Sequence, residues 1–205
     1  MLIAAGLVAS LLNAPAAMRP PAALPAISVH VMASSDLSPA LVSAVLDEAS
    51  AIWSAVGVRF VWRSGAEAAA NVRVLMGGGG HPLDEPVPLG WIAFDDEGQP
   101  APQIYLSYTN AVTLLRGAQR TLGRVDSMPP AQQNIYLSRA LGRALAHELG
   151  HYLLVSRQHT ADGLMKARHT SDNLFGPSRR PFSIDRSQRD ELEARVAGQI
   201  RVASR

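Results

Sequence analysis

The stretch RALAHELGHYLLVSRQHTADGLMKA, residues 143–167, places two histidines four residues apart with a glutamate between them. On a helix, side chains four residues apart lie on the same face, so His147 and His151 can direct both imidazoles at one point. Two nitrogen ligands about 2.0–2.1 Å from a zinc ion require that convergence. Glu148 lies beside such an ion, where it can take a proton from a metal-activated water and return it. The stretch therefore predicts a metal site with a general base. The alternative is two surface histidines on an amphipathic helix.

A catalytic zinc site usually has three protein ligands and a water, and His159 is the best third candidate. A helix that continued through this region would place His159 about 12 Å along the axis from His151. The helix must therefore end near Ser156, so that the chain can turn back. Other candidates for the third ligand are His169, Asp162 and Asp172, which flank Met165, and Glu191 and Glu193 near the carboxyl end.

The pattern around this stretch predicts alternating strands and helices. Apolar residues at a helical period run from Pro130 to near Ser156, and Gly150 leaves room for another element to pack closely. A second helix is predicted from the cap Ser38 and Pro39 to Gly57, and a closing helix after Ser183 or Asp185. Alternating or β-branched segments predict five strands, at 26–34, 58–63, 71–77, 89–95 and 103–108. The fold class is therefore α/β.

Composition predicts one globular domain and argues against nucleic-acid binding. The chain has 205 residues, of which 47% are hydrophobic, enough for a single core. Its formal net charge is only +2, and its arginines are spread without a basic run. There is no cysteine, which excludes disulfides and thiol catalysis and leaves histidine and carboxylate as metal ligands.

The amino-terminal residues are typical of a secretory signal. An apolar segment, residues 2–12, precedes Ala14-Pro15-Ala16, which fits a small-x-small cleavage site. We expect a signal peptide at 1–16, a Pro/Ala-rich tether at 17–25 and a single catalytic domain at 26–205. The apolar run is about half the roughly 20 residues that a membrane-spanning helix needs, so no stable membrane anchor is expected. The predicted localisation is periplasmic or secreted.

The order HELGHYLLVSRQH, then ADGLM, resembles the metzincin clan of zinc metallopeptidases. In that clan HExxH is followed by a third histidine and by a methionine in a tight turn beneath the metal. The resemblance implies a mixed five-stranded twisted sheet packed on two long helices, with a Met-turn and a carboxyl-terminal helix after the active-site helix. It also implies that His147, His151 and His159 bind one zinc ion, that Glu148 is the general base and acid, and that Met165 forms the floor of the site.

The sequence departs from the clan's usual pattern, HExxHxxGxxH, at two places. Leu154 stands where the clan has a glycine that ends the helix, and His159 comes two residues later than the usual third histidine. The resemblance further implies that residues 89–95 form an antiparallel edge strand that pairs with substrate. Trp91 and Phe94 on that strand are predicted to be core residues, although either could contact substrate.

The predicted function is that of a zinc endopeptidase acting on a peptide or protein substrate. The first alternative is an exported zinc-binding or peptide-binding module without turnover, which would bind zinc stoichiometrically but cleave no peptide. The second is a structural domain that binds no metal. Two other histidines are weaker candidates: His81, in the glycine-rich segment 76–82, could approach substrate, and His30 is predicted to be structural.

Overall fold

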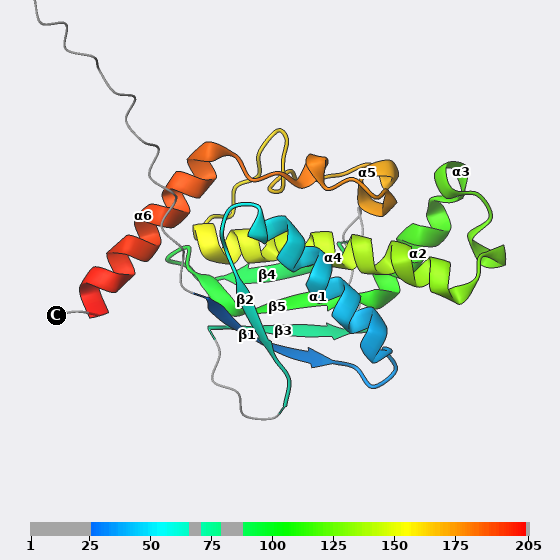
Figure 1. Cartoon of the computed structure of the whole chain (residues 1–205), viewed down its shortest axis with the longest axis horizontal. Coiled ribbons are helices and arrows are strands. Elements are labelled where there is room, and N and C mark those ends of the chain that lie inside the picture. Colours follow the sequence, from blue (N-terminus) through cyan, green and yellow to red (C-terminus); the bar gives the residue numbers. More distant parts are fainter. Residues whose placement is uncertain (1–25, 66–70, 79–87, 204–205) are drawn as a thin grey trace, which may run out of the picture.

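The computed structural model describes residues 26–65, 71–78 and 88–203, and Figure 1 shows their arrangement. The predicted signal peptide, the tether and His81 lie outside these residues. The strands are β1 (Ile27–Ala33), β2 (Phe60–Arg63), β3 (Val72–Gly77), β4 (Gly90–Phe94) and β5 (Pro100–Ser107). The longer helices are α1 (Pro39–Ser54), α2 (Tyr108–Gly117), α4 (Pro130–Leu154) and α6 (Arg186–Ala203). The short helices are α3 (Gln119–Leu122), η1 (Val125–Ser127), α5 (Ser171–Phe175) and η2 (Arg180–Phe182).

The five strands form one mixed sheet in the order β2-β1-β3-β5-β4. The first four of these are parallel, and β4 pairs antiparallel with β5 at the edge. This arrangement confirms the five predicted strands and the antiparallel edge strand. Among the described strands, none pairs with the other side of β4.

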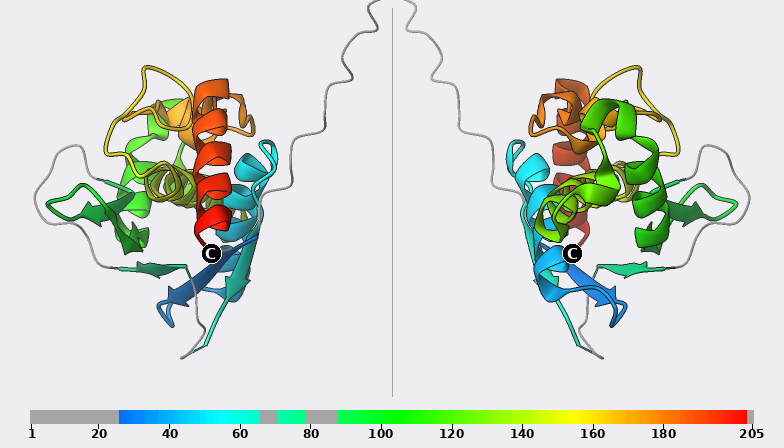
Figure 2. Two further views of the ribbon diagram at one scale, coloured as in Figure 1. Left: turned by 90° about the vertical axis from the view of Figure 1, so that its left-hand side faces the viewer. Right: turned by 90° about the vertical axis from the view of Figure 1, so that its right-hand side faces the viewer.

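The long helices lie on one side of the sheet (Figure 2). Along β3, Val72, Val74 and Met76 are buried, whereas Arg73 is exposed, as expected for a strand whose helix-covered face forms the core. Two of the predicted helices, α1 and α4, pack against each other over this core. The α/β class and the pair of long helices are therefore confirmed.

Close approach of α1 and α4 depends on a glycine. A Cβ atom at Gly142 would lie 2.5 Å from the Cβ of Glu48 and 2.8 Å from the carbonyl oxygen of Val45. Near the other end of the contact, the buried Trp53 donates its indole N–H to the carbonyl oxygen of Ala146 at 3.0 Å. These contacts fix the helix that carries the HExxH motif relative to the core.

The helices α2, α3, α5, η1 and η2 were not predicted. The helix α2 begins directly after β5, where the Ser107 hydroxyl accepts a hydrogen bond from the Asn110 amide at 3.2 Å. Its sequence, YTNAVTLLRG, is rich in residues of low helix propensity, so the pattern did not identify it as a helix. The closing helix was predicted, and Asp185 caps it by accepting from the Gln188 amide at 2.8 Å.

The prediction that Trp91 and Phe94 are core residues is wrong. Both side chains are only partly buried, because β4 is an edge strand and its faces are incompletely covered. Trp91 stacks on Tyr105 with ring centroids 5.2 Å apart, and Phe94 meets the ring of His151 edge-on at 6.2 Å. Within the described part of the chain, no helix has the length and apolar character needed to cross a membrane.

Candidate metal centre

The helix α4 ends where the metal-site prediction requires. Its last residue is Leu154, and Val155 follows in the left-handed conformation with φ 47° and ψ 50°. Val155 is the one non-glycine residue with positive φ among the residues described, and a β-branched side chain is disfavoured there. The chain therefore turns at Val155 without the glycine that the metzincin pattern places one residue earlier.

After this turn, the chain returns along the helix and is fastened to the segment around Met165. The Thr160 amide donates to the carbonyl oxygen of Met165 at 2.9 Å, and Thr160 forms an isolated bridge with Lys166. Arg157 binds the carbonyl oxygen of Asp95 and lies 5.0 Å above the Phe94 ring. These contacts hold the loop that carries His159 against both β4 and the turn containing Met165.

The three histidines of the predicted ligand set meet at one place. Their ring centroids are 4.7 to 5.2 Å apart, and one ligand nitrogen from each ring lies within 4.8 Å of the others. His151 is buried, His147 is partly buried, and His159 is exposed. The cluster therefore opens to solvent on the His159 side.

Hydrogen bonds to two backbone carbonyls orient the helical pair. His147 donates from Nδ1 to the Leu164 carbonyl oxygen at 2.8 Å, and His151 donates from Nδ1 to the Ser156 carbonyl oxygen at 2.6 Å. Because a carbonyl oxygen can only accept, each Nδ1 carries the proton and each neutral ring has its lone pair on Nε2. Hydrogen bonds of this kind typically fix the tautomer of a metal-binding histidine.

The donor set fits a cation. The two Nε2 atoms are 3.0 Å apart, close to the roughly 3.4 Å that separates two ligands of a tetrahedral zinc ion. Lone pairs that face each other at this distance need a proton or a metal ion between them. Burial lowers the pKa of His147 to about 3 and also lowers that of His151, so protonation near neutral pH is disfavoured. A metal ion satisfies the pair better than a proton.

Glu148 lies beside the histidines, under the first residue of β4. A Cβ atom at Gly90 would come within 3.1 Å of the Glu148 Cγ, so this glycine makes room for the carboxylate. Glu148 is 8% exposed, and burial raises its pKa to about 8. A carboxyl group whose pKa is near neutral can both accept and return a proton.

Met165 packs against the helix that carries His147 and His151, at Gly150. It is 2% exposed, and its Sδ would lie only 2.3 Å from a Cβ atom at Gly150. Its neighbour Leu164 supplies the carbonyl that orients His147. Gly163, with φ 72°, shapes this turn, where a Cβ atom would lie 2.6 Å from the Ser183 carbonyl oxygen. The turn therefore supports the site through both packing and a hydrogen bond.

We expect Gly150→Ala to lower the free energy of unfolding by about 1–2 kcal/mol, because overpacking outweighs the better helix propensity of alanine. Zinc affinity should fall as well, because Met165 and the Leu164 carbonyl must shift. Denaturant unfolding and zinc titration measure both effects. Gly117→Ala is the matched control, because Gly117 is also helical and a Cβ atom there meets nothing within 4 Å. Equal effects of the two changes would contradict this account.

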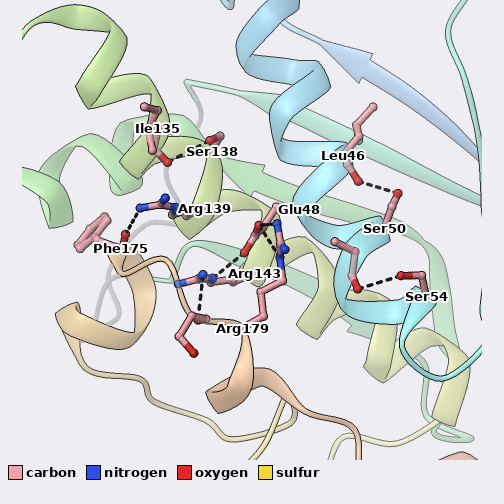
Figure 3. Close-up of polar contacts among 12 residues, drawn as sticks. Leu46, Glu48, Ser50, Ser54, Ile135, Ser138, Arg139, Arg143, Phe175 and Arg179 are labelled. Carbon is pink, nitrogen blue, oxygen red and sulfur yellow. Dashed lines mark hydrogen bonds and ion pairs between the residues drawn. The ribbon is translucent and has the colours of Figure 1, made fainter.

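One helical turn before His147, a buried ion-pair cluster fixes the segment that follows Met165 (Figure 3). Arg143 is 1% exposed and donates to the Glu48 carboxylate at 2.9 Å, while Arg179 donates to the other carboxylate oxygen at 2.7 Å. Arg143 also binds the carbonyl oxygens of Asn173, Leu174 and Ser178. The cluster thus joins α1, α4 and the chain around α5. Sequence reasoning did not identify it.

The other candidate ligands lie outside the histidine cluster. His169 packs its ring on Phe182 at 4.3 Å, and neither Asp162 nor Asp172 joins the cluster. Glu191 and Glu193 pair instead with Arg195 and Arg189 of α6. His30, predicted to be structural, is 5% exposed and hydrogen-bonds to the carbonyl oxygen of Gly65.

The metzincin-like α/β fold has a counterpart among solved structures. The chain is similar to archaemetzincin from Methanopyrus kandleri, with a TM-score of 0.51 over 88% of this chain and 99% of that chain. The two sequences are 12% identical, so the similarity is one of fold. A scan against protein-family models gave no match, and neither did a search of curated protein sequences.

Proposed function

We propose that this chain is a zinc-dependent metallopeptidase in which His147, His151 and His159 bind one zinc ion. The observation that carries the proposal is the pair of Nε2 atoms 3.0 Å apart, each held in place by a carbonyl bond from Nδ1. A third imidazole completes the ligand set, and a buried carboxyl group lies directly beside it. The similarity to the archaemetzincin fold supports the same class of activity.

The chain's own residues would divide the reaction between them. Bound zinc would supply Lewis-acid chemistry, which polarises the scissile carbonyl and lowers the pKa of a water towards about 7. Glu148 would take a proton from the attacking water and pass it to the leaving amine. The unpaired side of β4 would bind an extended peptide by strand addition. Met165 and the Leu164 carbonyl would keep the His147 ring in position.

Zinc titration of His159→Ala tests the ligand set. We expect the purified chain to bind one zinc ion and the variant to bind it at least about 100-fold more weakly, since even outer-shell changes cost about 10–100-fold. Elemental analysis and competition with a chromophoric chelator give the stoichiometry and affinity. His169→Ala is the matched control and should keep the affinity of the unchanged chain. Weaker zinc binding by His169→Ala together with unchanged binding by His159→Ala would make His169 the third ligand.

Peptide hydrolysis by the zinc-loaded chain tests the activity itself. Cleavage of a broad peptide library that stops on chelation and returns with zinc is the expected result. Stoichiometric zinc without cleavage of any library member would instead indicate a binding module without turnover.

We also propose that the protein is exported, with cleavage near Ala16. The apolar segment at residues 2–12 and the small-x-small site support this. Expression of the full chain in a bacterial host, followed by amino-terminal sequencing of the secreted or periplasmic fraction, checks it. A product that keeps residues 1–16 and stays in the cytoplasm would contradict the proposal.

A further inference from the structure

A cavity of about 390 Å³ opens directly beside the candidate metal centre. Its lining includes His147, Glu148 and His159 of the candidate metal centre, together with Lys166, Arg168 and His169. Leu114, Leu174 and Phe182 supply apolar parts of the lining. The cavity is therefore continuous with the place where a peptide bond would be hydrolysed.

Two cations in the cavity lining form no ion pair with a described carboxylate, although Asp162 and Asp185 line a neighbouring cavity together with Lys166. Neither Lys166 nor Arg168 forms an ion pair with any carboxylate in residues 26–65, 71–78 or 88–203. Arg143 also reaches the cavity, but Glu48 binds its guanidinium. The one described acid in the cavity lining is Glu148. The lining thus carries two cations, Lys166 and Arg168, that form no ion pair among the described residues.

His169 adds an unsatisfied polar group to the same wall. Both of its ring nitrogens are buried and neither has a hydrogen-bond partner among the described residues. The ring is held by Phe182, with centroids 4.3 Å apart, and so cannot easily turn to solvent. In either tautomer one ring nitrogen is a donor without an acceptor. Buried donors are normally paired, so the His169 ring lacks an acceptor, which a group that entered the adjoining cavity and displaced its neighbours would supply.

We propose that the wall formed by Lys166, Arg168 and His169 binds a carboxylate of the substrate, close to the scissile bond. This inference rests on the proposed peptidase function and deepens it, because it specifies that the preferred substrate carries a negative charge near the scissile bond. A carboxylate offers acceptors to a buried imidazole N–H and to two cations at once. The corresponding neutral amide would instead bring an NH2 donor against the donors of Lys166, Arg168 and His169. Two sources share this chemistry: an acidic side chain, or the free carboxyl terminus of a peptide.

The first experiment measures binding without turnover. Zinc-loaded Glu148→Gln is titrated with three probes: N-acetylglutamate α-amide, N-acetylglutamine with a free carboxyl group, and the neutral N-acetylglutamine α-amide. Chemical shifts of the His169 ring, assigned with a His169→Gln variant, report occupancy. We expect at least one monocarboxylate to bind about tenfold or more tightly than the neutral amide. The preferred one identifies the source, side chain or terminus.

Lys166→Met and Arg168→Gln should each reduce this preference to less than about threefold, because each removes a charge-assisted hydrogen bond. Arg120→Gln is the matched control, since it removes an exposed arginine on α3, away from the cavity. Arg168 is exposed, so its substitution tests the inference even if Lys166→Met fails to fold. Equal binding of all three probes would overturn the inference. A preference unchanged in both variants would also do so, because the carboxylate would then bind the metal instead.

The second experiment uses the active zinc-loaded chain and a peptide library in free-acid and amidated forms. We expect cleavage next to Asp or Glu over Asn or Gln, or cleavage near free termini that amidation abolishes. Cleavage without either preference overturns the carboxylate inference and leaves the peptidase proposal intact. Carboxylate binding in the first experiment without cleavage of any peptide would overturn the peptidase proposal and leave the carboxylate inference intact.

Discussion

Replacement of Glu148 by glutamine should lower kcat/KM for peptide hydrolysis by about 10³-fold or more, in the upper part of the range for loss of a general acid and base. Glutamine has nearly the same shape but cannot take a proton from water at neutral pH. The proposed ligands His147 and His151 are untouched, so zinc affinity should change by less than about threefold. Initial rates on a cleaved library peptide, together with zinc titration, separate the two effects. Retained hydrolysis would rule out Glu148 as the base.

A control and an independent readout strengthen this test. Glu193→Gln removes a carboxylate on α6 that pairs with Arg189 at 3.0 Å, so it should keep both activity and zinc.

Burial raises the pKa of Glu148 from 4.5 to about 8, so unfolding of the metal-free chain releases a proton between these pH values. The metal-free chain should therefore lose stability as pH rises from about 4.5 to about 8, and Glu148→Gln should lose less. Identical pH dependence in melting experiments would argue against a raised pKa.

The second large effect is expected from Glu48→Gln, which should lower the free energy of unfolding by about 3–5 kcal/mol. The change leaves Arg143, 1% exposed, with a buried positive charge and no counterion. For a domain of this size, the melting temperature should fall by about 10 °C or more. Denaturant and thermal unfolding of the zinc-loaded chain measure the loss. A cost below about 1 kcal/mol would mean that the carbonyl oxygens around Arg143 suffice to stabilise its charge.

Arg179→Gln is the matched control for this prediction. It removes the other partner of Glu48, but the Arg179 side chain is 51% exposed and its charge is solvated without the pair. Glu48 keeps Arg143 in this variant, so the cost should stay near or below about 1 kcal/mol. A similar loss in both variants would indicate that the cluster acts through its packing, not through the buried charge.

The parts of the fold and site that could be predicted were those encoded in local spacing. A spacing of four on a helix specified that His147 and His151 converge, and alternation located the five strands, whereas their place in one mixed sheet was expected from the resemblance. Glu48 and Arg143 depend instead on a tertiary contact, which no local pattern describes. A signal was nevertheless present, because each of the two residues interrupts an apolar stripe on its helix. Glu48 lies between Val45 and Ile52 on α1, and Arg143 lies between Ala140 and Leu145 on α4. Opposite charges within two core-facing stripes are a sign of a buried ion pair.

The cavity beside the candidate metal centre could not be predicted for a similar reason. Lys166, Arg168 and His169 follow the methionine turn in a short polar segment, where charged residues are ordinarily solvated. Their significance depends on Phe182 holding His169 and on Lys166 forming no ion pair with a described carboxylate. Both facts come from residues that pack together only in the folded chain.

The left-handed turn at Val155 has a consequence for how such sites are recognised in sequences. What the site needs after the helix is a reversal of the chain that aims the Ser156 carbonyl at His151 and brings back a third imidazole. Glycine supplies that reversal most easily, but here valine supplies it and the loop is two residues longer than the clan's pattern. A search template written as residue letters would reject this chain, whereas one written as a backbone angle followed by a returning histidine would accept it. Histidine pairs on helices that end in a left-handed residue are therefore worth screening even where no glycine follows them.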